Sequence, residues 1–283
     1  MRSLLWLLPA LLLTACPPDL ETAPALIVVE GFELKTEENE GAATADITEV
    51  WAFAGEDFIG VFPLPARIPL LRVGPTELRL EAGVRQDGRS VTPEIYPFYA
   101  PVRRTLDAVS GRTQNLGTLP IRYRDDAVFG FIEDFEAGRP RTFTDVVAGD
   151  GGLVPQTEVV RSGGTAGAVE LRDSNRLVEI ATAQTFTGLG TVPINVWLEV
   201  DYRSDAPAVF GVIGQRNGIG VRVFDPGFLP RAEWTKIYFN LGPVIGSADL
   251  DELRVAISTL LDDARDRGTV YLDNLKLLYL RPQ

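Results

Sequence analysis

The sequence predicts an all-β protein in which two β-sandwich domains follow one another after a cleaved signal peptide. Three observations lead to this fold class. Apolar residues alternate in short runs, the 27 Gly and 20 Pro are scattered along the chain, and no stretch sustains the 3.6-residue period of an amphipathic helix. A chain of 283 residues is also long enough for two domains of ordinary size.

The first sixteen residues have the layout of a secretory signal. Arg2 supplies a positive charge, an apolar run extends from Leu4 to Leu13, and small residues lead into Cys16, the only cysteine of the chain. A run of ten apolar residues is too short to span a bilayer, which takes about 20. We therefore expect this segment to be removed from the mature protein.

The residues Leu13, Thr14, Ala15 and Cys16 resemble the lipobox of bacterial lipoproteins. The resemblance implies cleavage before Cys16, acylation of Cys16 and a soluble body held at a membrane by lipid. Pro17 stands where lipoproteins retained in the inner membrane typically carry Asp, so the resemblance implies the outer membrane, with the side left open. The alternative is an ordinary signal peptide or short anchor in which the cysteine is incidental.

We divide the chain at changes in composition. The expected parts are a signal peptide (1–15), a lipidated tether (16–24), a first β-sandwich domain (25–124) and a second one (125–283). The tether is acidic and rich in proline, which suits a spacer between the membrane and the first domain. The charged joint from Arg124 to Asp126 marks the boundary between the domains.

In the first domain, runs typical of strands are separated by turns that contain glycine. The runs are EVWAFA (49–54), FIGVFPL (58–64), IPLL (68–71) and TELRLEAGV (76–84), with turns at 55–57 and 74–75. This order resembles PEGA-type domains, small sandwich modules of bacterial surface proteins, although the segment FPLPARIP carries an additional proline. The resemblance implies an immunoglobulin-like sandwich.

Three segments of the second domain resemble the first, penultimate and last strands of jelly rolls of the galactose-binding, carbohydrate-binding-module type. They are FIEDFEAG (131–138), EWTKIYFNL (233–241) and GTVYLDNLKLLYL (268–280). In the last strand the apolar phase slips by one residue between Asp273 and Asn274, which predicts a β-bulge and order up to Leu280. The segment 253–259 alternates strictly, so we predict a strand there and no helix.

Composition excludes several classes of activity. The chain has no histidine, and Cys16 is assigned to lipid, so His-based triads, Cys nucleophiles and His-rich zinc sites are excluded. The net charge of −12 argues against nucleic acid and anionic lipid as partners. The glycine-rich run RSGGTAGAVE (161–170) lacks the lysine of a phosphate-binding loop and is interpreted as a flexible loop. We expect no enzymatic activity.

The strand INVWLEVDYRS (194–204) carries the candidate ligand-binding residues. Its apolar face consists of Val196, Leu198, Val200 and Tyr202, and its other face carries Trp197, Glu199, Asp201 and Arg203. An aromatic ring beside carboxylates and a guanidinium is the chemistry of a sugar platform, because the ring stacks on the sugar while the charged groups bind its hydroxyls. The alternative is that a loop covers Trp197 and its neighbours are solvated.

An acidic cluster at the start of the second domain is the candidate metal site. Phe129, Phe131 and Phe135 predict an apolar face that Glu133 interrupts, with Asp134 directed outward. The jelly-roll resemblance implies a structural calcium between the first and last strands, with Glu133, Asp134 and Asp273 as ligands. The alternative is a strand end that enters a turn. No other cofactor is expected.

These features predict a membrane-anchored lipoprotein that acts as a non-enzymatic binding or assembly component of the cell envelope. Its partners would be the membrane, through the lipid anchor, and an envelope protein complex, but not nucleic acid. The alternative is a glycan-binding lipoprotein that uses the jelly roll. A more distant alternative is a glycoside hydrolase, because that chemistry needs only two spaced carboxylates.

Overall fold

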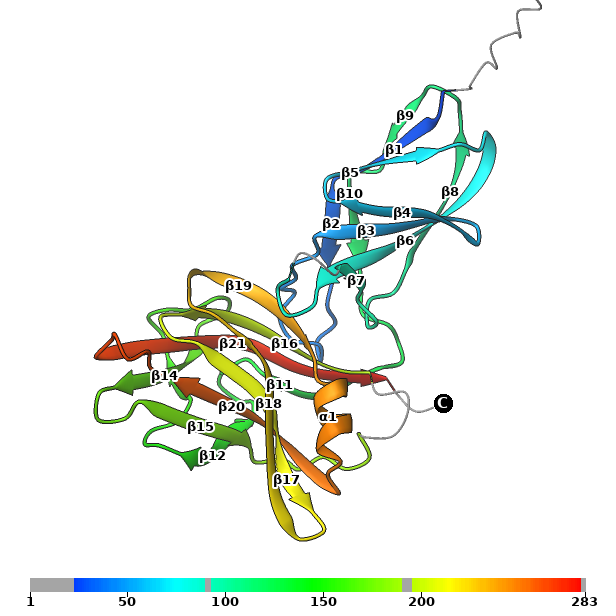
Figure 1. Ribbon diagram of the computed structural model, residues 1–283. Coiled ribbons are helices and arrows are strands. Elements are labelled where there is room, and N and C mark those ends of the chain that lie inside the picture. The colour runs from blue at the N-terminus through cyan, green and yellow to red at the C-terminus, as the bar shows by residue number, and fades with distance from the viewer. Residues whose placement is uncertain (1–22, 90–92, 190–194, 281–283) are drawn as a thin grey trace, which may run out of the picture.

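The computed structural model describes residues 23–89, 93–189 and 195–280, and strands dominate it (Figure 1). The chain forms two β-sandwiches, which confirms the predicted fold class. The predicted signal peptide, Cys16 and most of the tether lie outside the described residues. Among the described residues, no helix is long and apolar enough to cross a bilayer.

The first sandwich is built from strands β1 to β10. Their bounds are β1 (Ala25–Val29), β2 (Gly31–Leu34), β3 (Glu49–Ala54), β4 (Asp57–Pro63), β5 (Ala66–Leu70), β6 (Gly74–Arg85), β7 (Pro93–Ile95), β8 (Val102–Ala108), β9 (Thr113–Asn115) and β10 (Thr118–Ile121). One layer has the order β4-β3-β6-β7, with β8 also paired to β6, and the facing sheets are β5-β1-β9 and β10-β2. Alternation along β6 places Leu78 and Leu80 in the core and Arg79 and Glu81 on the outside.

The second sandwich is built from β11 to β21 and one short helix. The bounds are β11 (Ala127–Glu133), β12 (Phe143–Ala148), β13 (Val154–Gln156), β14 (Ala166–Arg172), β15 (Leu177–Thr182), β16 (Val196–Ser204), β17 (Ala208–Arg216), β18 (Ile219–Phe228), β19 (Arg231–Asn240), α1 (Gly242–Ala248), β20 (Glu252–Leu260) and β21 (Arg267–Leu280). One sheet has the order β13-β14-β21-β16-β19, with β11 also on β21, and the other has the order β12-β15-β20-β17-β18.

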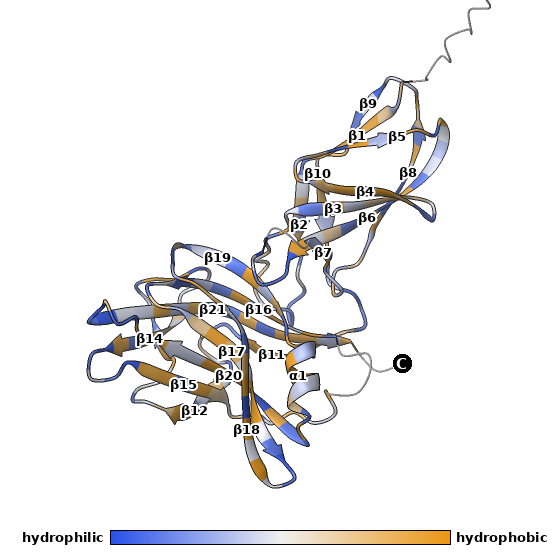
Figure 2. Ribbon diagram, in the orientation of Figure 1, coloured by the Kyte–Doolittle hydropathy of each residue, from blue (hydrophilic) through white to orange (hydrophobic). Residues whose placement is uncertain are grey.

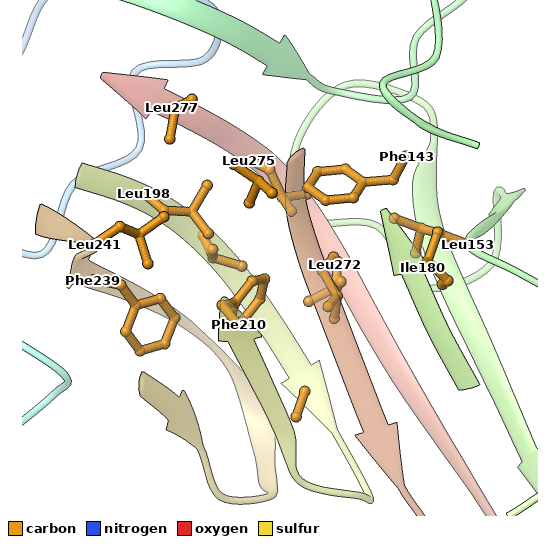
Figure 3. Packing of buried hydrophobic residues seen from close by; sticks show 14 of the residues in the cluster. Phe143, Leu153, Ile180, Leu198, Phe210, Phe239, Leu241, Leu272, Leu275 and Leu277 are labelled. Carbon is orange, nitrogen blue, oxygen red and sulfur yellow. The ribbon is translucent and has the colours of Figure 1, made fainter. Parts of the chain in front are cut away.

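The core of the second domain lies between these two sheets. Figure 3 shows Leu198, Phe239, Leu272 and Leu275 from one sheet pointing toward Phe210 from the other. The predicted apolar face of β16 is confirmed, since Val196, Leu198, Val200 and Tyr202 all belong to this core. The predicted strand at 253–259 is also confirmed as β20, because its alternation places Leu253, Val255 and Ile257 inside.

The closing strand contains the predicted β-bulge. Glu199 of β16 lies opposite Lys276, but Asp201 lies opposite Asp273, so β21 holds one additional residue between these pairs. Asn274 lies at this bulge and has a φ of 48°. This is a left-handed conformation that Asn tolerates better than most residues. On its other edge, β21 pairs with β14 before the bulge and with β11 after it.

Two local features differ from the sequence-based expectation. In β11 the register shifts between Phe129 and Phe131, so only Phe131 and Phe135 reach the second core, whereas Phe129 packs toward the first domain. The helix α1 was not predicted, because its seven residues are too few to show a helical period. Pro243 lies in its first turn, where no backbone donor is needed.

The two domains meet at the outward face of β16, β19 and β21. The apolar cluster of the first domain includes Trp197, Tyr238 and Leu278 of the second domain, and all three are buried. In Figure 1 the first domain lies over this sheet, with β7 toward β16 and β19. The segment between β2 and β3 also reaches the second domain, since the backbone N–H of Asp46 donates to the hydroxyl of Tyr238 at 3.0 Å.

Candidate functional site

The predicted sugar platform lies inside the contact between the domains. Trp197, Glu199 and Asp201 are 1%, 0% and 0% exposed, and only Arg203 reaches solvent. The indole of Trp197 packs edge-on against Tyr96 of the first domain, with the ring centroids 5.4 Å apart. A sugar cannot reach this face while the first domain covers it. The prediction placed these residues on the correct face of the strand, but that face is covered by a domain and not by a loop.

Glu199 is the centre of a buried polar cluster that joins the domains. Its carboxylate lies 3.0 Å from the ammonium of Lys236 and accepts hydrogen bonds from Tyr96 at 2.8 Å and Tyr123 at 3.0 Å. Burial alone would raise the pKa of Glu199, but Lys236, Lys276 and the Tyr96 hydrogen bond outweigh burial, so the pKa lies below its usual value. Glu199 is thus a buried anion held by groups from both domains.

Asp201 and Lys276 extend this cluster along the contact. Asp201 accepts a hydrogen bond from Thr44 of the first domain at 2.5 Å and from Asn274 at 3.1 Å. Lys276 donates to the backbone carbonyl of Ala42 at 2.8 Å and to the hydroxyl of Tyr123 at 3.2 Å. Burial lowers the pKa of Lys276 to about 8. Such networks hold two surfaces in one register, because most of their donors and acceptors are satisfied only in that register.

The glycine-rich run that begins at Arg161 binds carboxylates of its own chain. The backbone N–H groups of Arg161 and Ser162 donate to Asp273, and those of Gly164 and Thr165 donate to Glu136 at 2.6 and 3.0 Å. These amides bind anions as a phosphate-binding loop does, but side chains of the domain already occupy them. The run is therefore a structural connection between β13 and β14, whereas the sequence predicted a flexible loop.

The three predicted calcium ligands have other partners. Glu133 is 1% exposed, pairs with Arg141 at 3.0 Å and accepts the backbone N–H of Thr142. Asp134 lies 3.2 Å from Arg139, and Asp273 accepts backbone amides. In the ranges that the structure describes, no group of three or more acidic side chains is arranged to hold a metal ion. Within the described residues, Glu133, Asp134 and Asp273 are therefore not brought together as one set of ligands.

The opposite outward face of the second domain is open. A groove of about 650 Å³ lies on the outward face of the sheet β12-β15-β20-β17-β18 and is lined by residues of β12, β17, β18 and β20. Ile213 and Val147 line the groove, and both belong to a small apolar cluster with Ala181, Ala256 and Phe224. The short side chains in the middle strands make this part of the surface a depression, and longer side chains surround it.

Planar polar side chains form the walls of the groove. Residues that lie opposite one another in antiparallel strands share a face, so Arg222 and Arg254 flank Ile213, with Gln215 beside them. Arg222 donates to Glu179 at 2.8 Å and remains 54% exposed, and Arg254 is paired with Asp145. The walls thus present both donors and acceptors above an apolar floor.

Only some of the residues of this groove could be predicted from the sequence. Alternation in β20 already placed Arg254, Ala256 and Ser258 on one face, opposite the core residues. It did not show that Ile213 and Arg222 lie beside them, because strand order depends on contacts between distant segments. Trp197, Glu199 and Asp201 were the more conspicuous set in the sequence, since they combine an aromatic ring with charges on a single strand.

No protein-family model and no curated protein sequence matches the chain. Among the solved structures with a similar fold are carbohydrate-binding modules. One belongs to the β-sandwich superfamily, with 14% identity, 92% of this chain and 99% of that chain covered, and a TM-score of 0.40. Another is the family 30 module of a cellulosomal cellulase of Clostridium thermocellum, with 14% identity, 53% and 96% covered, and a TM-score of 0.41.

Proposed function

We propose that the protein is a non-catalytic, membrane-tethered glycan-binding protein, and that the groove on the outward face of β17 and β20 holds the glycan. The observation that carries this proposal is an open groove with an apolar floor and with guanidinium, amide and carboxylate groups on its walls. Sugars offer an apolar C–H face and several hydroxyls, so they suit a surface that combines both kinds of contact.

The same groove favours a glycan over an assembly partner. The centre of a stable protein–protein interface is apolar and depleted in charged residues. Here Arg222 and Arg254 line the groove on either side of Ile213, and each is already paired with a carboxylate of the same sheet. Paired side chains of this kind are pre-organised to hydrogen-bond hydroxyls without burial of an unpaired charge.

The binding test uses the full-length protein purified in detergent and a panel of polysaccharides: β-glucan, xylan, mannan, α-glucan and the anionic alginate. The double variant Arg222→Gln/Arg254→Gln removes two charge-assisted donors and should weaken binding at least about tenfold in calorimetric titration. Arg172→Gln is the matched control, because Arg172 is 69% exposed in an ion pair away from the groove. Unchanged affinity of the double variant would refute the groove as the site.

The tether is proposed from the lipobox-like residues that end at Cys16. Lipid at this position would hold the described domains close to a membrane, with the outer membrane expected from Pro17. Labelling of cells with a palmitate analogue, followed by Cys16→Ala, tests the anchor directly. Loss of label and release of the protein from the membrane fraction support it, whereas retained label contradicts it.

A further inference from the structure

We propose a second carbohydrate-binding surface on the first domain, an aromatic platform formed by Trp51, Phe53 and Phe58 on the outward face of β3 and β4, which binds a neutral polysaccharide. It goes beyond the groove because it lies on the other domain and uses aromatic rings instead of guanidinium groups. Phe58 is 54% exposed, and Trp51 and Phe53 are half-buried, with the indole nitrogen of Trp51 turned into the protein.

The three rings form one continuous surface. The ring centroid of Phe58 lies 5.7 Å from that of Trp51 and 5.3 Å from that of Phe53. Phe53 and Phe58 lie opposite one another in the two strands, as do Trp51 and Val61, so all these side chains share the outward face. Figure 2 shows the apolar character of β4 along its length.

A glycine in the neighbouring strand lets the indole lie against the sheet. A Cβ atom at Gly83 of β6 would lie 3.2 Å from Cδ1 of Trp51, so the ring occupies the space that a side chain would fill. The positions opposite Trp51 and Phe53 in β6 are Glu81 and Arg79. The ring of Trp51 thus lies low on the sheet, and the polar residues follow directly beside the aromatic ones.

Beside the aromatic rings lies a polar flank, which consists of Arg79, Glu81, Glu77 and Arg103. It offers hydrogen-bond donors and acceptors but carries no net charge. Arg79 is paired with Glu81, and its guanidinium lies 3.8 Å from the ring centre of Phe53. Arg103 of β8 is paired with Glu77 at 2.9 Å. The charges of the two arginines and the two glutamates cancel. The flank therefore suits a neutral ligand rich in hydroxyls better than a nucleic acid, an anionic lipid or a charged peptide.

This surface matches a polysaccharide in both of its parts. The C–H face of a sugar ring packs on an aromatic face, whose negative potential attracts the polarised C–H groups, while the hydroxyls at the ring edge reach Arg79 and Glu81. Because Arg79 lies over the ring of Phe53, the sugar would pack on the rings of Phe58 and Trp51. The platform and the groove lie on different domains of one chain, so a long polysaccharide can be held at two places.

The test separates the platform from the groove by combining their variants. Phe58→Ser, the groove double variant Arg222→Gln/Arg254→Gln and their combination are titrated in full-length protein against soluble β-glucan, xylan and mannan. Phe58→Ser should weaken binding about tenfold with the groove either intact or changed. Leu71→Ser is the matched control, because Leu71 is also an exposed apolar residue, at 81%, but lies outside the platform. If Phe58→Ser lowers the melting temperature, Trp51→Tyr replaces it as the variant of the platform.

Tryptophan fluorescence gives a local readout. Trp197 is buried and Trp6 belongs to the predicted signal peptide, so the half-buried Trp51 and Trp234 are the reporters. Saturating polysaccharide should protect the emission from acrylamide quenching, and Trp51→Phe should abolish that protection whereas Trp234→Phe should not.

The outcomes are distinct. Loss of affinity in Phe58→Ser alone supports the platform and refutes the groove, and loss in the groove variant alone does the reverse. Unprotected Trp51 at saturation overturns the platform. So does self-association of the wild type that Phe58→Ser abolishes, because the exposed rings would then be covered by a second copy along the β4 edge. A wild type that binds none of the three polysaccharides overturns both sites.

Discussion

The two outward faces of the second sandwich carry similar residues in opposite surroundings. The face of β16, β19 and β21 holds Glu199 and Lys236 at 0% and 1% side-chain exposure, and the face of β15, β17, β18 and β20 holds Glu179 and Arg222 at 13% and 54%. The first pair is sealed under the first domain, whereas the second stands beside an open groove. Oppositely charged residues on neighbouring positions of a sheet therefore identify an outward face, but only what covers that face decides whether the pair joins the domains or is open to solvent.

The largest expected effect comes from removal of the buried anion. Glu199→Ala leaves Lys236 without its close partner and takes the acceptor from two tyrosines, so unfolding free energy should fall by about 3 to 5 kcal/mol. Glu179→Ala, on the open face, should cost at most about 1 kcal/mol. Urea unfolding of the two variants measures the difference, and equal losses would contradict the contrast between the faces.

The second effect is a pH dependence of the unfolding free energy. We expect it from the covered face of β16, β19 and β21 and not from the open face. Burial raises the pKa of Asp273 from 3.8 to about 7, so between these values the folded protein binds more protons than the unfolded chain. This contribution makes stability fall as pH rises from about 4 to 7, by on the order of 3 kcal/mol. For Lys276, with a pKa lowered from 10.5 to about 8, the unfolded chain binds more protons, so stability rises again between those values.

Unfolding of the wild type and of Asp273→Asn, measured by urea at pH 5 and pH 7, separates the Asp273 contribution from those of other carboxyls. The difference between the two pH values should be smaller in the variant. An identical fall in both proteins would show that Asp273 is not responsible.

A third, smaller effect concerns the bulge that shapes this face. Asn274→Val places a β-branched residue at a φ of 48° and removes hydrogen bonds to Ser162 and Asp201, so it should cost about 2 kcal/mol or more. Asn274→Gly tolerates the backbone conformation and loses only the side-chain hydrogen bonds, so its cost should be lower. Thermal unfolding ranks the two variants, and a greater loss for glycine would show that the backbone conformation is unimportant.

The smallest effect is expected on the open face. Arg254→Gln removes a pair whose side chains are 31% and 47% exposed, which should change stability by about 1 kcal/mol or less. The melting temperature of this variant therefore checks that the binding variants remain folded. A large loss would mean that the groove walls are structural, and it would remove the contrast with the buried face.

Much of the fold was predictable because strand patterns are local. Alternation in β16 and β20 identified their core faces, and the phase slip at Asp273 and Asn274 identified the bulge. The same reasoning failed at Phe129, because a register shift in β11 turns its side chain to the other side. The helix α1 was missed because a single short turn of helix carries no period.

The sequence by itself determined the fold class, the inward and outward side of most strands and the absence of histidine chemistry, since these follow from residue type and from alternation over a few positions. Only the tertiary structure decided which outward face is covered and which is open. Glu199 meets Tyr96 from 103 residues away, and Lys276 meets Ala42 from 234 residues away. The burial of a side chain depends on such contacts between distant segments, and no pattern within one strand contains them.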